Sequence, residues 1–348
     1  MISTTPQKIR RLFIGATSAM LVAGAGMAAP PTDPAVLAAR QTISTEDMSR
    51  LVQDLSAPAY DGRLPGTPGD IASRDYLVRL FRSIGLKPAG TQGYLLPFTT
   101  TITQPDGEDT PANPALGRVV KTSNIIGIIP GNAPVLSHEV ILISGHRDHL
   151  GHAPDLQQYP GANDDLTGVA ATVELARAFA RIRHMNKRTL MFVAFGAEEQ
   201  ERMGSTYQVD HPLPVAPNRN IVLMLSIDMI GRDFDAWSGF SQRRMDRFAD
   251  RWFAEVYNGT DSHKDAYSFE YPDESDGSDA AVTYDYDAGA FAAHGINTRV
   301  IGLATDPNYH SPADTWANVH FDPMLPVTRT IFDFVWQVDQ DPAAHAGE

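Results

Sequence analysis

Short runs of apolar residues recur along the chain and alternate with segments of helical or loop character. Residues 70–84 place apolar side chains three and four positions apart and are followed by Gly85, which predicts an amphipathic helix. A second helix is predicted at 168–184, and the polar stretch 105–117 is predicted to be a loop. The continuous apolar runs predict buried strands, and they lie at 124–129, 139–144, 190–195, 221–227 and 298–303.

Continuous apolar strands separated by helices are typical of a sheet that is covered on both faces. We therefore expect an α/β fold with a doubly wound, mostly parallel (mixed) sheet and helices on both faces. In such sheets ligands bind beyond the carboxyl ends of the strands. The polar residues that follow each strand are the first place to look for chemistry.

Possible metal ligands follow several of the predicted strands. A single His or Asp at a strand end is usually a cap or turn residue. Here, however, several strand ends at one edge each carry such a residue, and adjacent buried glutamates need a cation between them. This pattern predicts a site for a metal such as Zn²⁺. The residues concerned are His146, Asp148 and His149 after 139–144, Glu198-Glu199 after 190–195, Asp228 after 221–227, Tyr309-His310 after 298–303, and Asp164-Asp165 before the second helix.

The composition of the chain argues against several classes of protein function. The chain has 348 residues, a formal net charge of −14 and no cysteine. The negative charge argues against a nucleic-acid partner. The lack of cysteine excludes disulfides, a thiolate nucleophile and a cysteine zinc site. No Gly-x-Ser-x-Gly motif occurs, which disfavours a serine hydrolase of the elbow type.

The first 28 residues have the pattern of a signal peptide. Lys8, Arg10 and Arg11 precede an uncharged apolar run from 12 to 28, which is shorter than the ~20 residues that a spanning helix needs. We expect cleavage before Ala29, export to the periplasm or the medium, and no stable membrane association afterwards.

Five motifs in order resemble one known family. They are SGHRDHLG, PGANDDLTGVAA, RTLMFVAFGAEE, LSIDMIGR and YHSPADT, spread over about residues 120–320, with DGRLPGTPGD at 61–70 as a lead-in. The pattern is similar to the zinc-dependent aminopeptidases and glutamate-carboxypeptidase-like peptidases, which have a dinuclear site. The resemblance implies a peptide substrate and a zinc-peptidase fold. It also implies one catalytic domain over 29–348, because the connection at 98–120 is too short for an inserted protease-associated domain.

The resemblance also implies a role for each site residue, with two Zn²⁺ ions per chain. Glu198 would be the general base, and the Asp164–Asp165 peptide bond would be cis. Asp148 would support His146, and Tyr309 would either stabilise the oxyanion or only pack. The implied ligands are His146 and Asp228 for one zinc, Glu199 and His310 for the other, and Asp164 as the bridge.

Acidic residues outnumber basic ones near this site, which favours an aminopeptidase that recognises a free α-ammonium and releases neutral, apolar N-terminal residues. The acids are Glu198, Asp228 and Glu201, and the cations are Arg147, Arg202 and Arg232. A carboxypeptidase stays open, because Arg202 could pair with Glu201 or bind a substrate carboxylate. Two further functions stay open as well: a glutaminyl cyclase-like transferase, which has a single zinc, and a noncatalytic binding protein on the same fold.

Three further features are expected not to bind the metals. His149 and His152 extend a His-x-x-His pattern from His146, but a loop gives them no fixed face. The acidic stretch 272–279 is out of register with an EF-hand loop, so we expect a solvated turn there.

Overall fold

The sheet at the centre of the fold is mixed, with its parallel strands side by side. A computed structural model of the chain describes residues 32–104, 113–153, 155, 157–232, 286–302 and 306–342. Within these residues the strand order is β1-β3-β5-β4-β6-β7, and β2 pairs with β3. Strands β5, β4, β6 and β7 are parallel, whereas β1, β2 and β5 run antiparallel to β3. The strands are β1 (Lys87–Pro88), β2 (Leu95–Thr101), β3 (Val119–Ile129), β4 (Val140–His146), β5 (Thr189–Phe195), β6 (Ile221–Asp228) and β7 (Thr298–Gly302).

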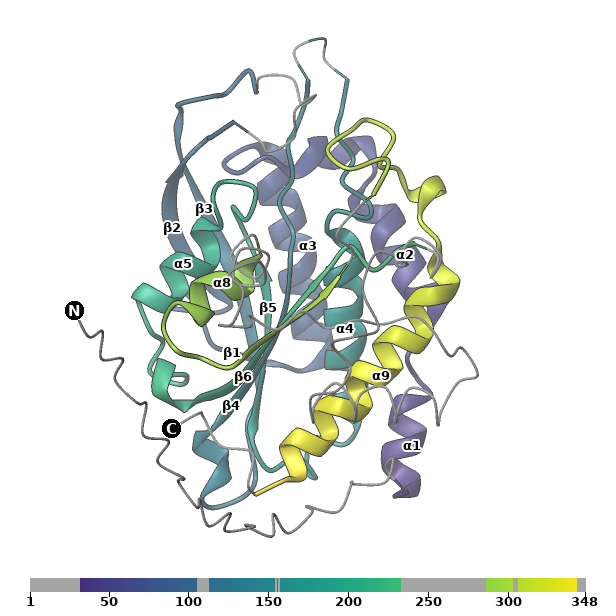
Figure 1. Cartoon of the computed structure of the whole chain (residues 1–348), viewed down its shortest axis with the longest axis vertical. Coiled ribbons are helices and arrows are strands. Elements are labelled where there is room, and N and C mark those ends of the chain that lie inside the picture. Colours follow the sequence, from purple (N-terminus) through teal and green to yellow (C-terminus); the bar gives the residue numbers. More distant parts are fainter. Residues whose placement is uncertain are drawn as a thin grey trace, which may run out of the picture.

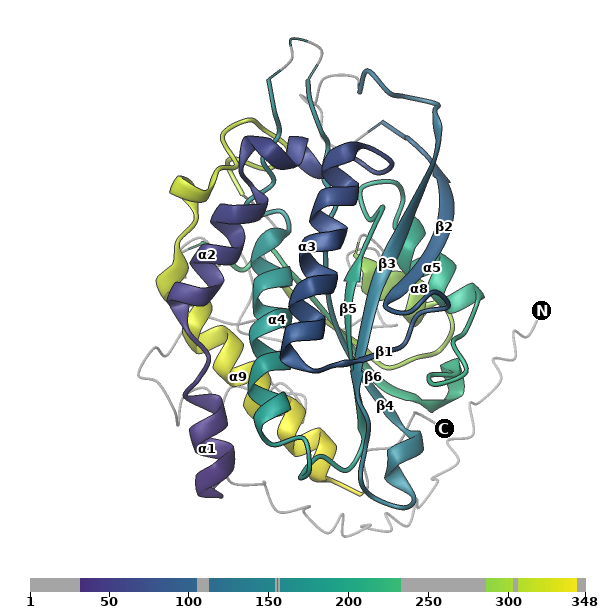
Figure 2. The ribbon, with the colours of Figure 1, turned by 180° about the vertical axis from the view of Figure 1, so that it is seen from behind.

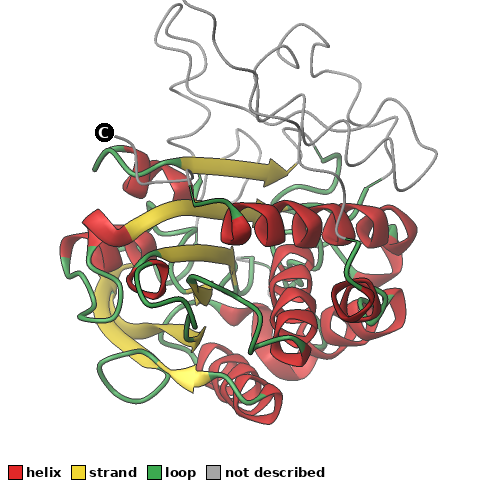
Figure 3. Ribbon diagram, turned by 90° about the horizontal axis from the view of Figure 1, so that it is seen from below, coloured by secondary structure: helices red, strands yellow, loops and turns green. Residues whose placement is uncertain are grey.

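The helices form two unequal layers, one on each face of the sheet (Figures 1 and 2). The larger layer lies to one side of the strands in the view from below (Figure 3). It contains α1 (Pro34–Arg40), α2 (Thr45–Leu55), α3 (Pro68–Ile84), α4 (Leu166–Arg181) and α9 (Phe321–Gln340). The smaller layer contains α5 (Met203–Asp210) and α8 (Asp287–Ala292). Short 3-10 turns lie at Pro58–Arg63, Leu136–His138, Asn218–Asn220 and Trp316–Asn318.

Strand β4 shows why the central strands are apolar throughout. Successive side chains in a strand point to opposite faces. Ile141 and Ile143 accordingly pack in the core under α4, while Val140 and Leu142 pack in the core on the α5 and α8 side. All seven residues of β4 are buried, so no position could be polar without a buried partner.

The predicted fold class is confirmed, and each predicted strand overlaps an observed one. The predicted helix 70–84 is α3, which begins two residues earlier because Thr67 accepts the Asp70 N–H and Pro68 suits the first turn. It ends at Gly85, whose φ of 80° is left-handed. The predicted helix 168–184 is α4, which starts at Leu166 and stops at Arg181.

Several predictions fall on residues that the structure does not describe. They concern the signal peptide at 1–28, most of the loop at 105–117 and the acidic stretch 272–279. The single domain over 29–348 stays a prediction as well. No helix in the described residues is both long and apolar enough to cross a membrane.

Candidate metal centre

The predicted site residues gather at the carboxyl edge of the parallel strands. His146 is the last residue of β4, and Asp228 is the last residue of β6. Glu198 and Glu199 lie in the turn after β5, and His310 lies in the connection after β7. Asp164 precedes α4, whose first residue is Leu166.

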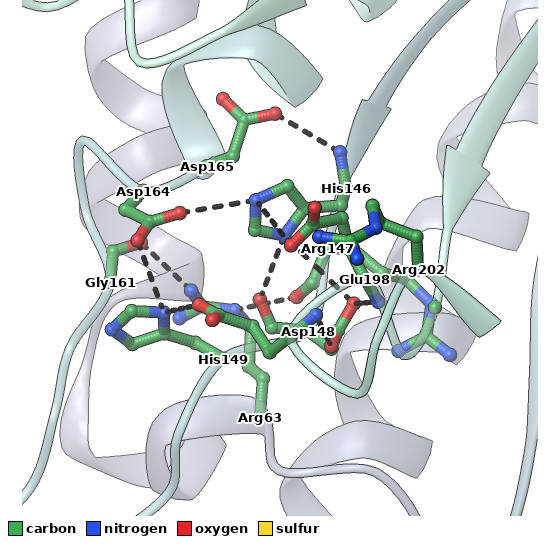
Figure 4. Close-up of polar contacts among 12 residues, drawn as sticks. Arg63, His146, Arg147, Asp148, His149, Gly161, Asp164, Asp165, Glu198 and Arg202 are labelled. Carbon is green, nitrogen blue, oxygen red and sulfur yellow. Dashed lines mark hydrogen bonds and ion pairs between the residues drawn. The ribbon is translucent and has the colours of Figure 1, made fainter. Parts of the chain in front are cut away.

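His146 contacts three of the carboxylates through one ring nitrogen. Its Nε2 atom lies 3.1 Å from Asp164 Oδ1, 3.7 Å from Asp228 Oδ2 and 3.8 Å from Glu198 Oε2. Its Nδ1 atom lies 3.3 Å from the carbonyl oxygen of Asp148. These contacts place Asp164, Asp228 and Glu198 around one nitrogen of His146. Figure 4 shows His146 with Asp164 and Glu198.

His310 and Glu199 form the other side of the cluster. His310 Nε2 lies 3.0 Å from Glu199 Oε2 and 3.3 Å from Asp164 Oδ2. The second oxygen of Glu199 lies 2.6 Å from Nδ1 of His149, a residue expected not to bind the metals. Asp164 therefore lies between the two groups, since its two oxygens face His146 and His310 respectively.

Asp165 fixes the backbone on the His146 side. Its carboxylate accepts the N–H of His146 at 3.0 Å, of Gly168 at 2.8 Å and of Met229 at 3.1 Å. This close approach depends on Gly145, where a Cβ atom would lie 2.8 Å from Asp165 Oδ2 and 2.7 Å from the α4 backbone. One side chain thereby joins the ends of β4 and β6 to the start of α4.

Asp148 and Asp314 hold the other segments. The carboxylate of Asp148 accepts the N–H of Glu198 at 3.0 Å and of Glu199 at 3.3 Å. It lies 3.9 Å from His146 Nδ1, so the close contact to that ring comes from its carbonyl instead of the carboxylate. Asp314 accepts the N–H of Asn163 at 2.8 Å and of Asp164 at 3.0 Å.

The backbone beside the ligands adopts unusual conformations. Ala197, Met229 and His310 have φ values of 61°, 58° and 50°, in the left-handed region that side chains disfavour. Such residues cost about 1–3 kcal/mol each and persist where the surroundings fix them. The Asp164–Asp165 peptide bond is cis, as the resemblance implied.

Burial and mutual repulsion shape the electrostatics of the cluster. Burial raises the pKa of Asp228 to about 7 and that of Asp148 to about 6. Burial opposes protonation of His310, yet the carboxylates of Glu199 and Asp164 raise its pKa to about 11. Burial also acts to raise the pKa of Glu199, but the His310 ring lowers it to about 2. The cluster is therefore a place where positive charge is strongly favoured.

The donor set fits a divalent metal. Among the described residues, Asp164 Oδ2 and Asp228 Oδ1 are buried and make no hydrogen bond. Ligand atoms of His146, Asp164 and Glu199 lie within 4.8 Å of one another, as do those of His146, Asp165 and Asp228. Because Asp165 already accepts three N–H groups, Asp164 is the aspartate with an oxygen left to coordinate an ion. Imidazole and carboxylate ligands of this kind suit Zn²⁺.

Tyr309 lies at the rim of the cluster. Its ring stacks on His310 with centroids 3.7 Å apart, and the residue is 43% exposed. Partial burial and the carboxylates of Asp164 and Glu199 raise its pKa, so the hydroxyl keeps its proton in the neutral range.

The three arginines expected near the site all have carboxylate partners. Arg147 points away from the metal ligands and pairs with Asp70 at 2.5 Å, because neighbouring strand residues face opposite ways. Arg232 pairs with Asp306 at 2.7 Å. Arg202 pairs with Glu201 at 3.4 Å, one of the two roles considered for it.

Four buried residues beside the ligands make supporting contacts that were not predicted from the sequence. They are Arg63, His149, Asp165 and Asp314. Arg63 donates to the carbonyl oxygens of Leu55, Arg147, Pro160 and Gly161 and so links the lead-in motif to two site loops (Figure 4). His149, Asp165 and Asp314 all lie inside the five family motifs. Their place in these motifs was the sequence feature that could have indicated a role at the site.

Comparison with known proteins decides the family. The model of peptidase family M28 matches residues 124–335, more than half of the chain. The chain belongs to peptidase family M28. The predicted family is thereby confirmed, and the matched region contains every proposed ligand of this M28 chain.

Individual relatives are distant in sequence. Leupeptin-inactivating enzyme 1 of Streptomyces exfoliatus is 29% identical over 231 residues, which cover 66% of this chain and 44% of that protein. The M28 chain thus spans under half the length of this curated relative.

Solved structures share the fold. An aminopeptidase from Aneurinibacillus sp. strain AM-1 has a TM-score of 0.62 at 17% identity, covering 90% of this chain and 97% of that one. A glutaminyl cyclase from Bacteroides thetaiotaomicron has a TM-score of 0.56 at 15% identity, covering 85% and 98%. The fold alone therefore does not separate peptide hydrolysis from cyclisation.

Proposed function

We propose that the chain is an exported dinuclear zinc metallopeptidase, and specifically an aminopeptidase. The observation that carries the proposal is the buried convergence of two histidines and three carboxylates, two of whose oxygens make no hydrogen bond among the described residues. Membership of family M28 supports the same activity. The residues that would hold the ions are His146 and Asp228, Glu199 and His310, with Asp164 shared between them.

The remaining residues have defined tasks in peptide hydrolysis. Zinc held by these residues would supply a Lewis acid for the scissile carbonyl and would lower the pKa of a bound water molecule. Glu198 accepts the proton of the attacking water and delivers it to the leaving amine. Burial raises the pKa of Glu198, which strengthens it as a base, and the Asp148 carboxylate holds its backbone N–H. The Tyr309 hydroxyl is a donor for the negative charge that develops on the carbonyl oxygen.

The balance of charge supports cleavage at the amino end. A substrate carboxylate needs an arginine or lysine, yet Arg147, Arg202 and Arg232 are each within 4.0 Å of a carboxylate. A free α-ammonium instead suits a site rich in buried carboxylates. This reasoning favours an aminopeptidase over a carboxypeptidase.

The test is hydrolysis of leucyl p-nitroanilide beside its N-acetylated form. We expect kcat/KM to fall about 10–100-fold on acetylation, the loss for one charge-assisted hydrogen bond. Equal rates for the two substrates would contradict recognition of the α-ammonium and favour the carboxypeptidase. Conversion of glutaminyl peptides to pyroglutamyl peptides with release of ammonia, together with one zinc per chain, would favour the cyclase.

Export is a separate part of the proposal and rests on the pattern of residues 8–28. N-terminal sequencing of the protein from a host with an export pathway should find a chain that begins at or near Ala29. An intact Met1 on protein from the cytoplasm would contradict it.

A further inference from the structure

His149 is a buried polar side chain that the proposed mechanism leaves without a task. It is fully buried, and its ring lies 5.8 Å from the ring of His310 and 6.4 Å from that of Tyr159. Gly161 faces it so closely that a Cβ atom there would lie 2.5 Å from the imidazole. The ring is therefore held in one orientation (Figure 4).

The orientation of the ring aims one nitrogen at the ligand cluster. Nδ1 of His149 lies 2.6 Å from Glu199 Oε1 and 3.9 Å from Asp164 Oδ2. A metal-binding carboxylate is ionised and only accepts hydrogen bonds. Nδ1 must then carry the proton and donate to Glu199, which leaves no lone pair on this nitrogen for a metal.

The two oxygens of Glu199 consequently have different neighbours. Oε1 is held by His149, whereas Oε2 lies 3.0 Å from His310 Nε2. Fixing one oxygen of a carboxylate determines where the other points. The His146 side is held differently. There the Asp165 carboxylate accepts the backbone N–H groups of His146 and Met229.

We propose that His149 is a positioning residue for one half of the site: it fixes Glu199 so that the ion shared by Glu199 and His310 binds tightly. The inference rests on the proposed function, since it assumes that the cluster holds zinc. It predicts that loss of His149 weakens one ion selectively and leaves the ion of His146 and Asp228 unchanged.

The experiment is a Zn²⁺ titration of the metal-free full-length protein and two variants. In His149→Leu the donor is lost, and we expect one of the two ions to bind about 10–100-fold more weakly. In His149→Asn the amide nitrogen takes the place of Nδ1, and we expect recovery of most of that loss. If His149 were instead a metal ligand, His149→Asn should lose zinc affinity as His149→Leu does, because an amide oxygen is a much weaker zinc ligand than an imidazole nitrogen.

A double-variant comparison assigns the weakened ion. Adding His149→Leu to His310→Ala should change zinc affinity little, because that half is already damaged. Adding it to Asp228→Ala should weaken the remaining ion by the same about 10–100-fold. The matched control is His152→Leu in the same loop, where His152 contacts only Asp61 among the ion pairs of the described residues, at 3.3 Å. This control should bind zinc as the parent does.

The outcomes separate the inference from the proposed function. A parent protein that binds no zinc would overturn the proposed function itself. A parent that binds two ions, with His149→Leu binding both as tightly, would overturn the inference alone. Equal weakening of both ions, or no rescue by His149→Asn, would also overturn it, and thermal unfolding of the metal-free variants would then identify a general loss of stability.

Discussion

The two halves of the metal centre are attached to the fold in different ways. His146 and Asp228 end the neighbouring parallel strands β4 and β6, and the Asp165 carboxylate joins the backbone at both strand ends. Glu199 and His310 lie on connections outside the sheet and depend on side-chain contacts. Strand ends therefore place one pair of ligands directly, whereas the other pair needs supporting residues.

The shared residue should produce the largest effect. Asp164 faces His146 at 3.1 Å and His310 at 3.3 Å, so Asp164→Ala removes a contact from both halves. We expect both ions to be weakened by more than the about 10–100-fold typical of residues that only support a ligand, with activity lost at the same time. Metal analysis after dialysis measures this. Asp75→Ala, at an exposed position paired with Arg74, is the control, and a folded Asp164→Ala that keeps two ions would disprove the bridge.

Glu198→Gln should separate chemistry from metal binding in both halves at once. The amide is nearly isosteric with the acid but cannot accept the proton, so turnover should fall about 10²–10⁴-fold with both ions retained. Single-turnover hydrolysis with zinc content measured on the same sample checks this. Glu199→Gln is the matched neighbour and should lose metal instead. Full activity in Glu198→Gln would show that another group is the base.

Asp165→Asn should weaken only the strand-end half. The Asn oxygen can still accept the N–H of Gly168 and Met229, but the amide group would face the N–H of His146 with no acceptor. We expect about 10–100-fold weaker binding of the ion at His146, measured by competition with a chelator. The loss should add to that of His149→Leu in the double variant. If the two losses fall on the same ion, the division into halves is wrong.

Arg202→Gln should have the smallest effect. Arg202 and Glu201 form an exposed pair at 3.4 Å, and such pairs contribute about 0–1 kcal/mol. We expect kcat/KM for leucyl p-nitroanilide to change less than about fivefold. Arg147→Gln, which breaks the buried pair with Asp70, should instead lower the free energy of unfolding by about 3–5 kcal/mol. A collapse of activity in Arg202→Gln would point to recognition of a substrate carboxylate.

The difference between the two halves also explains which features the sequence could predict. The apolar run 139–144 indicates a buried strand, so His146 at its end could be placed at the sheet edge from the pattern alone. The motifs located Asp164, Glu199 and His310 through resemblance to a family. The hydrophobic pattern did not predict strand β2 or helices α1, α2 and α9.

The supporting contacts could not be predicted, because they join residues far apart in sequence. The His149 side chain contacts the Glu199 carboxylate, 50 positions away in sequence. The Asp314 carboxylate accepts the N–H of Asp164, 150 positions away. Arg147 was counted as a cation near the site from its place beside His146. The alternation of side chains along a strand sends it to the other face instead, where Asp70 lies.

Calorimetric titration of the metal-free full-length protein with Zn²⁺, followed by leucyl p-nitroanilide hydrolysis at each point, tests the dinuclear centre itself. Two histidines and two carboxylates around a shared Asp164 predict a stoichiometry of two ions per chain, with full activity only when both are bound. A stoichiometry of one, or full activity after the first ion, would contradict a dinuclear site.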